Sequence, residues 1–296
     1  MLRARSALVM VPALATLLAL GAAGCSSEVL VTDTGSPSPV PSSTTTATPT
    51  ATPTTTPTTP VPPGPEAPKK SYVRFLHSGF QYAANVIFCL RKDGETTYTD
   101  VTKSVGISGV PQGSMTRYVE LAAGTYFAVA NVKSCPTADP TNGELAKVTV
   151  AAGYATIALY GNGGYSGEFG PHVGLFTDDV TAPDAGRKIR ALHFGITYSR
   201  AETLYSGSTP LFPDMKFGTP PKSSPMGTVN AQGYLLDTAG KVTDVNAGGI
   251  GGEIPRKDKG VYTAIFQGAQ GSGFFPLRVL VCPDDPTSES PLVTCK

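Results

Sequence analysis

A run of threonine and proline near the start of the chain sets the first limit on what can fold. From Thr34 to Pro68 the chain is almost only Thr, Pro, Ser and Ala, so it offers little apolar surface to bury. Proline favours the extended polyproline II conformation, in which each residue adds about 3.1 Å. We therefore expect residues 25–70 to be a disordered spacer, which leaves about 225 residues for folded structure.

The segment before the spacer has the three parts of an export signal. Two arginines precede an apolar run from Ala7 to Leu20, and small residues lead from there to Cys25. These small residues before a cysteine resemble the lipobox of bacterial lipoproteins, although Ala22 stands where leucine is usual. The resemblance implies a signal peptide over residues 1–24 and a lipid on the Cys25 thiol. Ordinary cleavage, which would release a secreted protein, is the alternative.

Beyond the spacer, two parts of the chain begin alike. Tyr72–His77 and Lys188–His193 both alternate apolar and polar residues, as half-buried strands do, and both end in Leu-His. A second pair of similar segments, Ala152–Leu159 and Lys259–Phe266, follows at a comparable distance in each part. The repetition predicts two related halves.

Turn-forming residues separate these halves at Phe176–Gly186. We place a first domain at 71–185 and a second at 186–296. Short alternating strands, spaced about 8–12 residues apart by Gly, Pro and Asn turns, predict an all-β fold. We expect two tandem β-sandwich domains, each made of two packed antiparallel sheets.

Further motifs carry a resemblance to a known family. After the opening strand come Asn85–Leu90 and then Val119–Tyr126, which ends in Ala-Gly-Thr-Tyr. Their order resembles the bacterial surface family catalogued as domain of unknown function 4397, which often occurs in tandem in secreted proteins and lipoproteins. The second half departs from it, with a glycine-rich stretch at 246–252, and the first has Ser78–Phe80 where the family has Ser-Pro-Asp. The resemblance implies an immunoglobulin- or transthyretin-like sandwich with no established activity.

Four cysteines besides Cys25 are an even number in a chain bound for an oxidising compartment, which predicts disulfides. Of the three possible pairings we favour Cys89 with Cys135, and Cys282 with Cys295 as a clasp on the tail. A metal site is the rival interpretation, but no close Cys-x-x-Cys pair is present. We expect no bound metal.

Charge and motifs exclude several classes of function. The chain has 23 Lys+Arg and 22 Asp+Glu, and loss of the two leader arginines leaves 21 − 22 = −1, so nothing favours nucleic acid. No Gly-x-Ser-x-Gly elbow, phosphate loop or His-Glu-x-x-His motif occurs. We therefore predict no catalytic residues, no cofactor and no enzymatic activity.

A few residues are candidates for contact with a ligand. His77 and His193 end the matching strands, and either a ligand contact or a buried hydrogen bond explains them. Tyr160 and Tyr165 flank a glycine-rich turn, where tyrosine can stack on a sugar or meet a protein, or can simply fill the core. The absence of tryptophan argues against sugar binding.

The sequence thus predicts a non-catalytic module, anchored to the membrane by its lipid and facing outward or into the periplasm. Its partner would be an envelope protein or a polysaccharide. One alternative is a structural lipoprotein that joins an envelope complex by strand addition at a sheet edge. The other is a surface hydrolase, which would need His77 or His193 in a cleft beside a nucleophile.

Overall fold

The computed structural model describes residues 70–296 except for short gaps. These gaps are 141–144, 197–200, 207–208, 226, 238–243, 248–249, 254, 256–258, 271 and 273–274. The predicted signal peptide, Cys25 and the spacer up to residue 69 lie outside the described residues. By their contacts, the described residues belong to one compact unit.

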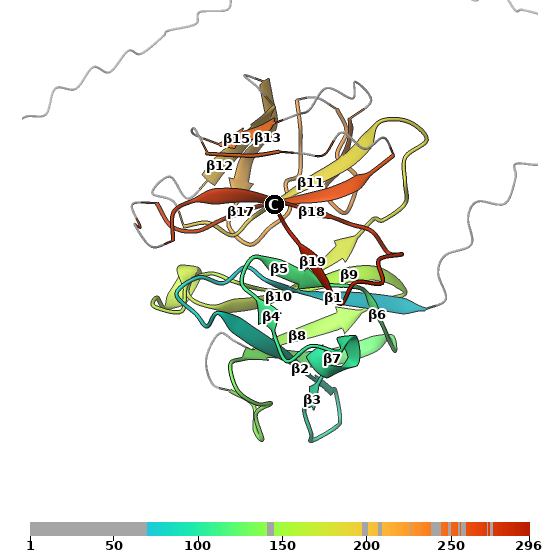
Figure 1. Ribbon diagram of the computed structural model, residues 1–296, viewed down its shortest axis with the longest axis vertical. Coiled ribbons are helices and arrows are strands. Elements are labelled where there is room, and N and C mark those ends of the chain that lie inside the picture. Colours follow the sequence, from blue (N-terminus) through green and yellow to red (C-terminus); the bar gives the residue numbers. More distant parts are fainter. Residues whose placement is uncertain are drawn as a thin grey trace, which may run out of the picture. The chain divides into compact units, whose positions relative to one another are not determined.

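The described part of the chain is all-β, as predicted, with two short 3-10 turns, η1 (Thr102–Val105) and η2 (Gly167–Phe169) (Figure 1). The strands of the first half are β1 (Ser71–His77), β2 (Asn85–Lys92), β3 (Thr99–Asp100), β4 (Val110–Pro111), β5 (Ser114–Thr116), β6 (Val119–Leu121), β7 (Gly124–Asn131), β8 (Leu145–Val150), β9 (Gly153–Tyr160) and β10 (His172–Asp178). Those that follow are β11 (Arg187–His193), β12 (Ala201–Ser206), β13 (Thr209–Lys216), β14 (Tyr234–Asp237), β15 (Asp244–Ala247), β16 (Ile250–Glu253), β17 (Val261–Gln267), β18 (Arg278–Pro283) and β19 (Leu292–Thr294).

Each half packs two sheets around its own core. In the first half the sheet β10-β9-β1-β5-β19, with β6 also beside β1, faces the sheet β3-β2-β7-β8, with β4 also beside β2. Val73 and Phe75 of β1 pack there against Phe88 and Ile157, because alternate residues of a strand point to the same face. The sheets β14-β11-β17-β18 and β13-β12-β15-β16 form the second half, which has a separate apolar cluster around Phe212.

The prediction of purely antiparallel sheets is wrong in both halves. β1 pairs with β9 in parallel, with Phe75 opposite Ile157, and β11 pairs with β17 in parallel, with Leu192 opposite Ile265. Between β1 and β9 the chain forms β5 and β6 beside β1 and then completes the opposite sheet with β7 and β8. It returns from that sheet by a crossover, so β9 runs in the direction of β1. Alternation of apolar residues predicts a strand and its buried face, but it says nothing about direction.

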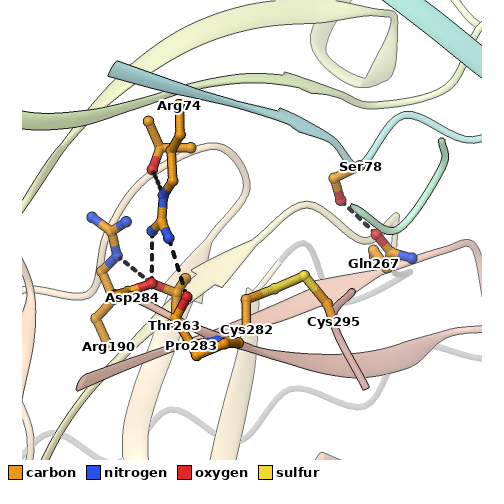
Figure 2. Close-up of a disulfide and its surroundings, with 10 residues drawn as sticks. Arg74, Ser78, Arg190, Thr263, Gln267, Cys282, Pro283, Asp284 and Cys295 are labelled. Carbon is orange, nitrogen blue, oxygen red and sulfur yellow. Dashed lines mark hydrogen bonds and ion pairs between the residues drawn. A yellow bond between two sulfur atoms is a disulfide. The ribbon is translucent and has the colours of Figure 1, made fainter. Parts of the chain in front are cut away.

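A third apolar cluster joins the two halves. Leu76 of β1 and Ala158 of β9 pack there with Leu192 of β11 and Ile265 of β17. Both faces of β1 and of β11 are therefore covered, one by the opposite sheet of the same half and the other by the other half. The Ser78 hydroxyl also lies 2.7 Å from the side-chain amide of Gln267, across the same boundary (Figure 2).

Both predicted cysteine pairings are present. Cys89 and Cys135 have an S–S distance of 2.13 Å, and Cys282 and Cys295 one of 2.08 Å. The second disulfide ties β18 to the residue after β19, as the yellow bond in Figure 2 shows.

The strand β19 crosses to the first half. It pairs with β5, with Val293 opposite Met115, and Figure 1 shows it in dark red beside that green strand. The predicted second domain, 186–296, thus ends in a strand that belongs to a first-half sheet. The clasp holds this strand in place, because Cys295 is bonded to Cys282 of the second half.

Candidate functional site

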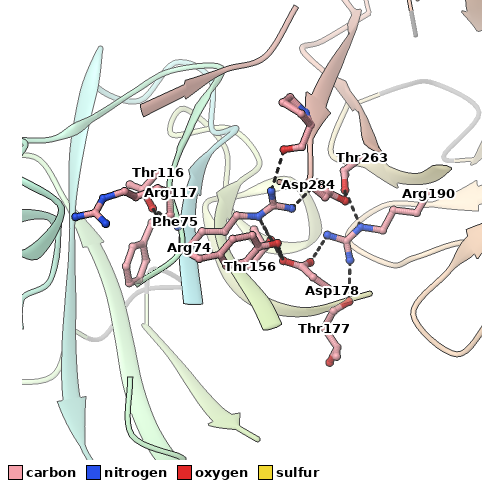
Figure 3. A network of polar contacts seen from close by, with 12 residues as sticks. Arg74, Phe75, Thr116, Arg117, Thr156, Thr177, Asp178, Arg190, Thr263 and Asp284 are labelled. Atoms are coloured by element: carbon pink, nitrogen blue, oxygen red, sulfur yellow. Dashed lines mark hydrogen bonds and ion pairs between the residues drawn. The ribbon is translucent and has the colours of Figure 1, made fainter. Parts of the chain in front are cut away.

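Four buried charged side chains lie between the halves, one arginine and one aspartate from each. Arg74 of β1 donates from Nη2 to Oδ1 of Asp284 at 2.6 Å. Arg190 of β11 donates in the same way to Asp178 at the end of β10 (Figure 3). Each arginine therefore pairs with the aspartate of the other half, and the four charges cancel.

Each aspartate is also held by its own half. Asp178 accepts hydrogen bonds from the hydroxyls of Thr156 at 2.7 Å and Tyr118 at 2.6 Å. Asp284 receives the same two bonds from Thr263 and Tyr234. We call these eight side chains the buried network: Arg74, Tyr118, Thr156, Asp178, Arg190, Tyr234, Thr263 and Asp284. Their arrangement repeats from one half to the other, so the halves correspond residue by residue around it.

The buried network is electrically neutral and internally satisfied. Burial raises the pKa of Asp178, but Arg190 and Arg74 outweigh it and hold that pKa below its ordinary value. Burial raises the pKa of Tyr118 and Tyr234 well above the ordinary value, so both hydroxyls remain protonated donors. Every buried polar side-chain atom of the network has a partner. These residues join the halves and leave no group for a ligand.

The two matching histidines are buried as well. His77 has Nε2 2.8 Å from the carbonyl oxygen of Ala83, and burial lowers its pKa. His193 stacks on Phe266 with ring centroids 5.1 Å apart, and neither of its ring nitrogens has a partner. No hydrogen bond among the described residues links either ring to a serine, cysteine or carboxylate. Their positions therefore give the hydrolase alternative no support.

Acidification should destabilise the protein through His193. Burial lowers the pKa of His193 to about 4, against an ordinary value of 6.5, so between these pH values the unfolded chain binds more protons than the folded one. The free energy of unfolding should be level above pH 6.5 and fall by up to about 3 kcal/mol as the pH drops to 4. Denaturant unfolding across this range measures it. In His193→Phe, which keeps a ring against Phe266, the slope between pH 6.5 and about 5 should become shallow. His77 is then the remaining histidine with a lowered pKa, and an unchanged slope would contradict the assignment.

The two candidate tyrosines have different surroundings. Tyr160 stacks on Phe194 with ring centroids 4.5 Å apart and packs against Phe217, so it belongs to the apolar contact between the halves. Tyr165 is 56% exposed in the connection between β9 and β10. The structure therefore presents only the second of these two side chains to a partner.

A different group of tyrosines lines an open cleft of about 540 Å³ beside the start of β1. Tyr72 and Tyr154 are opposite each other on β1 and β9, and their rings stack with centroids 5.0 Å apart. Tyr118 meets Tyr154 edge to face at 5.1 Å. We call this the tyrosine cleft; its lining residues are Tyr72, Ser104, Arg117, Tyr118, Val119, Glu120, Tyr154 and Pro286.

The tyrosine cleft contains polar groups that the protein does not use. Arg117 Nε is buried without a hydrogen-bond partner, and no carboxylate among the described residues pairs with this side chain. Figure 3 shows its guanidinium pointing away from the buried network. The hydroxyls of Tyr72 and Tyr154 make no hydrogen bond within the described part. Glu120 pairs with Lys70 at 2.8 Å, with both side chains more than half exposed.

Sequence reasoning missed this cleft. Tyr72 and Tyr154 are 82 positions apart (154 − 72), and only the parallel pairing of β1 with β9 brings them together. The buried network has a signal in the sequence, because Arg74 and Arg190 occupy the same place in the two matched strands, whereas the prediction named the histidines of these strands.

No family model matches the chain, and no curated protein matches it either.

Among the described residues, no three His, Cys, Asp or Glu side chains are grouped so that they could hold a metal ion. In the same part of the chain, no helix combines the length and the hydropathy needed to cross a membrane.

Proposed function

We propose that this protein is a lipid-anchored, non-catalytic binding module of the cell envelope, and that the tyrosine cleft is its contact with an envelope or matrix component. The observation that carries the proposal is the cleft itself, in which aromatic rings and an unpaired guanidinium line an open hollow. Binding sites commonly combine aromatic walls with a few polar groups that fix the orientation of the ligand. The lipobox-like motif at Cys25 and the resemblance to the tandem surface family agree with this setting.

The rest of the molecule is compatible with a role in holding the tyrosine cleft away from the membrane. The charged groups buried between the halves pair with one another. His77 and His193 are buried, and their pKa values are lowered. A spacer of some 30 residues in polyproline II conformation would carry the cleft up to about 100 Å from the membrane. The lipid on Cys25 would supply the membrane attachment, since each buried methylene contributes about 0.8 kcal/mol.

The structural alternative, strand addition at a sheet edge, has less support. β8 ends its sheet, and it carries the exposed Lys147, which pairs with Asp93 at 2.9 Å. Charged residues on an edge strand discourage pairing with another chain. The tyrosine cleft is therefore the better candidate for a contact.

Capture from envelope and matrix fractions tests the proposed function. The full chain, held in detergent with its disulfides intact, should retain one component saturably. The double variant Tyr72→Ala, Tyr154→Ala should lose at least about 90% of this capture, since aromatic contacts dominate such sites. Tyr165→Ala, which removes an exposed tyrosine elsewhere, is the matched control and should capture normally. Absence of saturable capture by the folded wild-type chain would refute the proposal, and loss in the control alone would move the site to Tyr165.

A further inference from the structure

We infer that the ligand of the tyrosine cleft is a carboxylated saccharide, such as a polymer that contains uronic acid. This inference rests on the proposed function and adds the chemical class of the ligand. Three observations carry it: an unpaired cation, the two tyrosine rings of Tyr72 and Tyr154 with free hydroxyls, and the contrast between the two halves.

The cation is Arg117. The two arginines of the buried network, Arg74 and Arg190, each have a carboxylate of the other half as partner. Arg117 has none, and its buried Nε lacks even a neutral acceptor. An unsatisfied donor of this kind costs free energy in the unliganded protein and calls for an explanation. A guanidinium matches a carboxylate in geometry and charge, so an acid group on the ligand would supply the missing partner.

The tyrosines suit a sugar even though the chain has no tryptophan, because a tyrosine ring also offers an aromatic face. Tyr72 and Tyr154 are partly exposed and offer both ring surface and hydroxyls without partners. Pyranose rings present C–H faces that pack on aromatic rings and hydroxyls that need donors and acceptors at the edges. Glu120 stands beside Tyr72 in the neighbouring strand, and its second carboxylate oxygen can accept from a sugar hydroxyl. Because Glu120 is already paired with Lys70, the uncompensated charge of the cleft is that of Arg117.

The second half shows that these features are not a by-product of the fold. At the positions that correspond to Tyr72 and Tyr154 it has Lys188 and Val261, in the same parallel register. Lys188 Nζ lies 2.6 Å from Oδ2 of Asp179 and donates to the carbonyl of Thr181 at 2.8 Å. The second half thus has a cation, Lys188, in the place of Tyr72 and satisfies it internally, whereas the first half has tyrosine in that place and leaves the neighbouring Arg117 unpaired.

Calorimetric titration of the full chain in detergent with a galacturonic acid oligomer tests the inference. The matched ligand is the methyl ester of the same oligomer, which keeps the rings and removes the charge. We expect the acid to bind at least about tenfold more tightly than the ester, since charge-assisted hydrogen bonds are the stronger ones. Arg117→Gln should abolish this preference. Arg91→Gln, which removes a guanidinium lying over Tyr98 and Phe127 elsewhere in the first half, should retain it.

Several outcomes would overturn the inference. Equal affinity of the wild-type chain for acid and ester would do so without any variant, and so would a preference that survives in Arg117→Gln. Tighter binding of a peptide with the sequence of residues 44–60, lost in Tyr72→Ala, would assign the cleft to proline-rich peptides instead. If envelope capture depends on the cleft while the acid oligomer fails to bind, the proposed function stands and the saccharide is wrong; if both fail, both proposals fall.

Discussion

Replacement of Asp284 by alanine should lower the free energy of unfolding by about 3–5 kcal/mol, because it removes the nearer of the two carboxylates that pair with Arg74 and leaves the buried network with one uncompensated positive charge. The hydroxyls of Thr263 and Tyr234 lose their acceptor at the same time. A domain is typically stable by only about 5–15 kcal/mol, so the variant should be close to unfolding. Urea unfolding followed by circular dichroism measures the change.

A double-mutant cycle separates the ion pair from general damage. Arg74→Met should also be costly, whereas Arg74→Met combined with Asp284→Leu should cost less than the sum of the two, since no unpaired charge is then buried. The control is Asp93→Asn, which breaks the exposed pair with Lys147 and should leave the unfolding midpoint unchanged. Additive losses in the cycle would mean that the two residues act independently, contrary to the structure.

Removal of the clasp by Cys282→Ala together with Cys295→Ala should cost about 3 kcal/mol, the value expected for a cross-link over the observed separation of 13 residues. The effect should extend beyond the second half. Without the disulfide, β19 is held to β5 only by a short antiparallel pairing, so the amides on that edge should exchange with solvent faster. These are the amide of Arg117, which donates to the carbonyl oxygen of Pro291 at 3.2 Å, and that of Met115 two residues earlier. Hydrogen exchange with mass spectrometry measures this directly.

The other disulfide provides the comparison. Cys89→Ala with Cys135→Ala opens a cross-link over 46 residues and should cost about 4 kcal/mol, which is more than removal of the clasp. It should nevertheless leave the amides of β5 protected when exchange is compared at equal overall stability. Faster exchange at β5 in both variants alike would show that the clasp has no special role in joining β19 to the first half.

The opening strands and the cysteine pairs could be predicted from local features. The alternation in Tyr72–His77 and Lys188–His193 identified β1 and β11 to within a residue, because one face of each packs in a sandwich core. Cys282 and Cys295 are close in sequence, and the prolines between them do not favour a continuous strand. These two features predicted a disulfide that closes a short loop.

The features that join the halves could not be predicted in this way. In an alternating strand, Arg74 stands at a polar position that normally faces water, yet here that face meets the other half and Arg74 is only 1% exposed. The carboxylate that makes this burial possible, Asp284, is 210 positions away. The same holds for the tyrosine cleft, whose rings come from separate strands and whose rim includes Pro286. Patterns within one strand carry no information about such neighbours.

The crossing of β19 sets the order in which the molecule can be completed. Val293 pairs with Met115 across a separation of 293 − 115 = 178 positions. Because closing so long a loop costs chain entropy, we expect this pairing to form late. Whether it leaves the ribosome or crosses a membrane, the chain emerges with its N-terminus first. The edge of β5 therefore stays unpaired while more than a hundred further residues emerge. During that interval a strand from a neighbouring nascent chain can take the place of β19. Pairing of residues 292–294 with β5 removes the open edge, and the disulfide between Cys282 and Cys295 then keeps β19 close to β5.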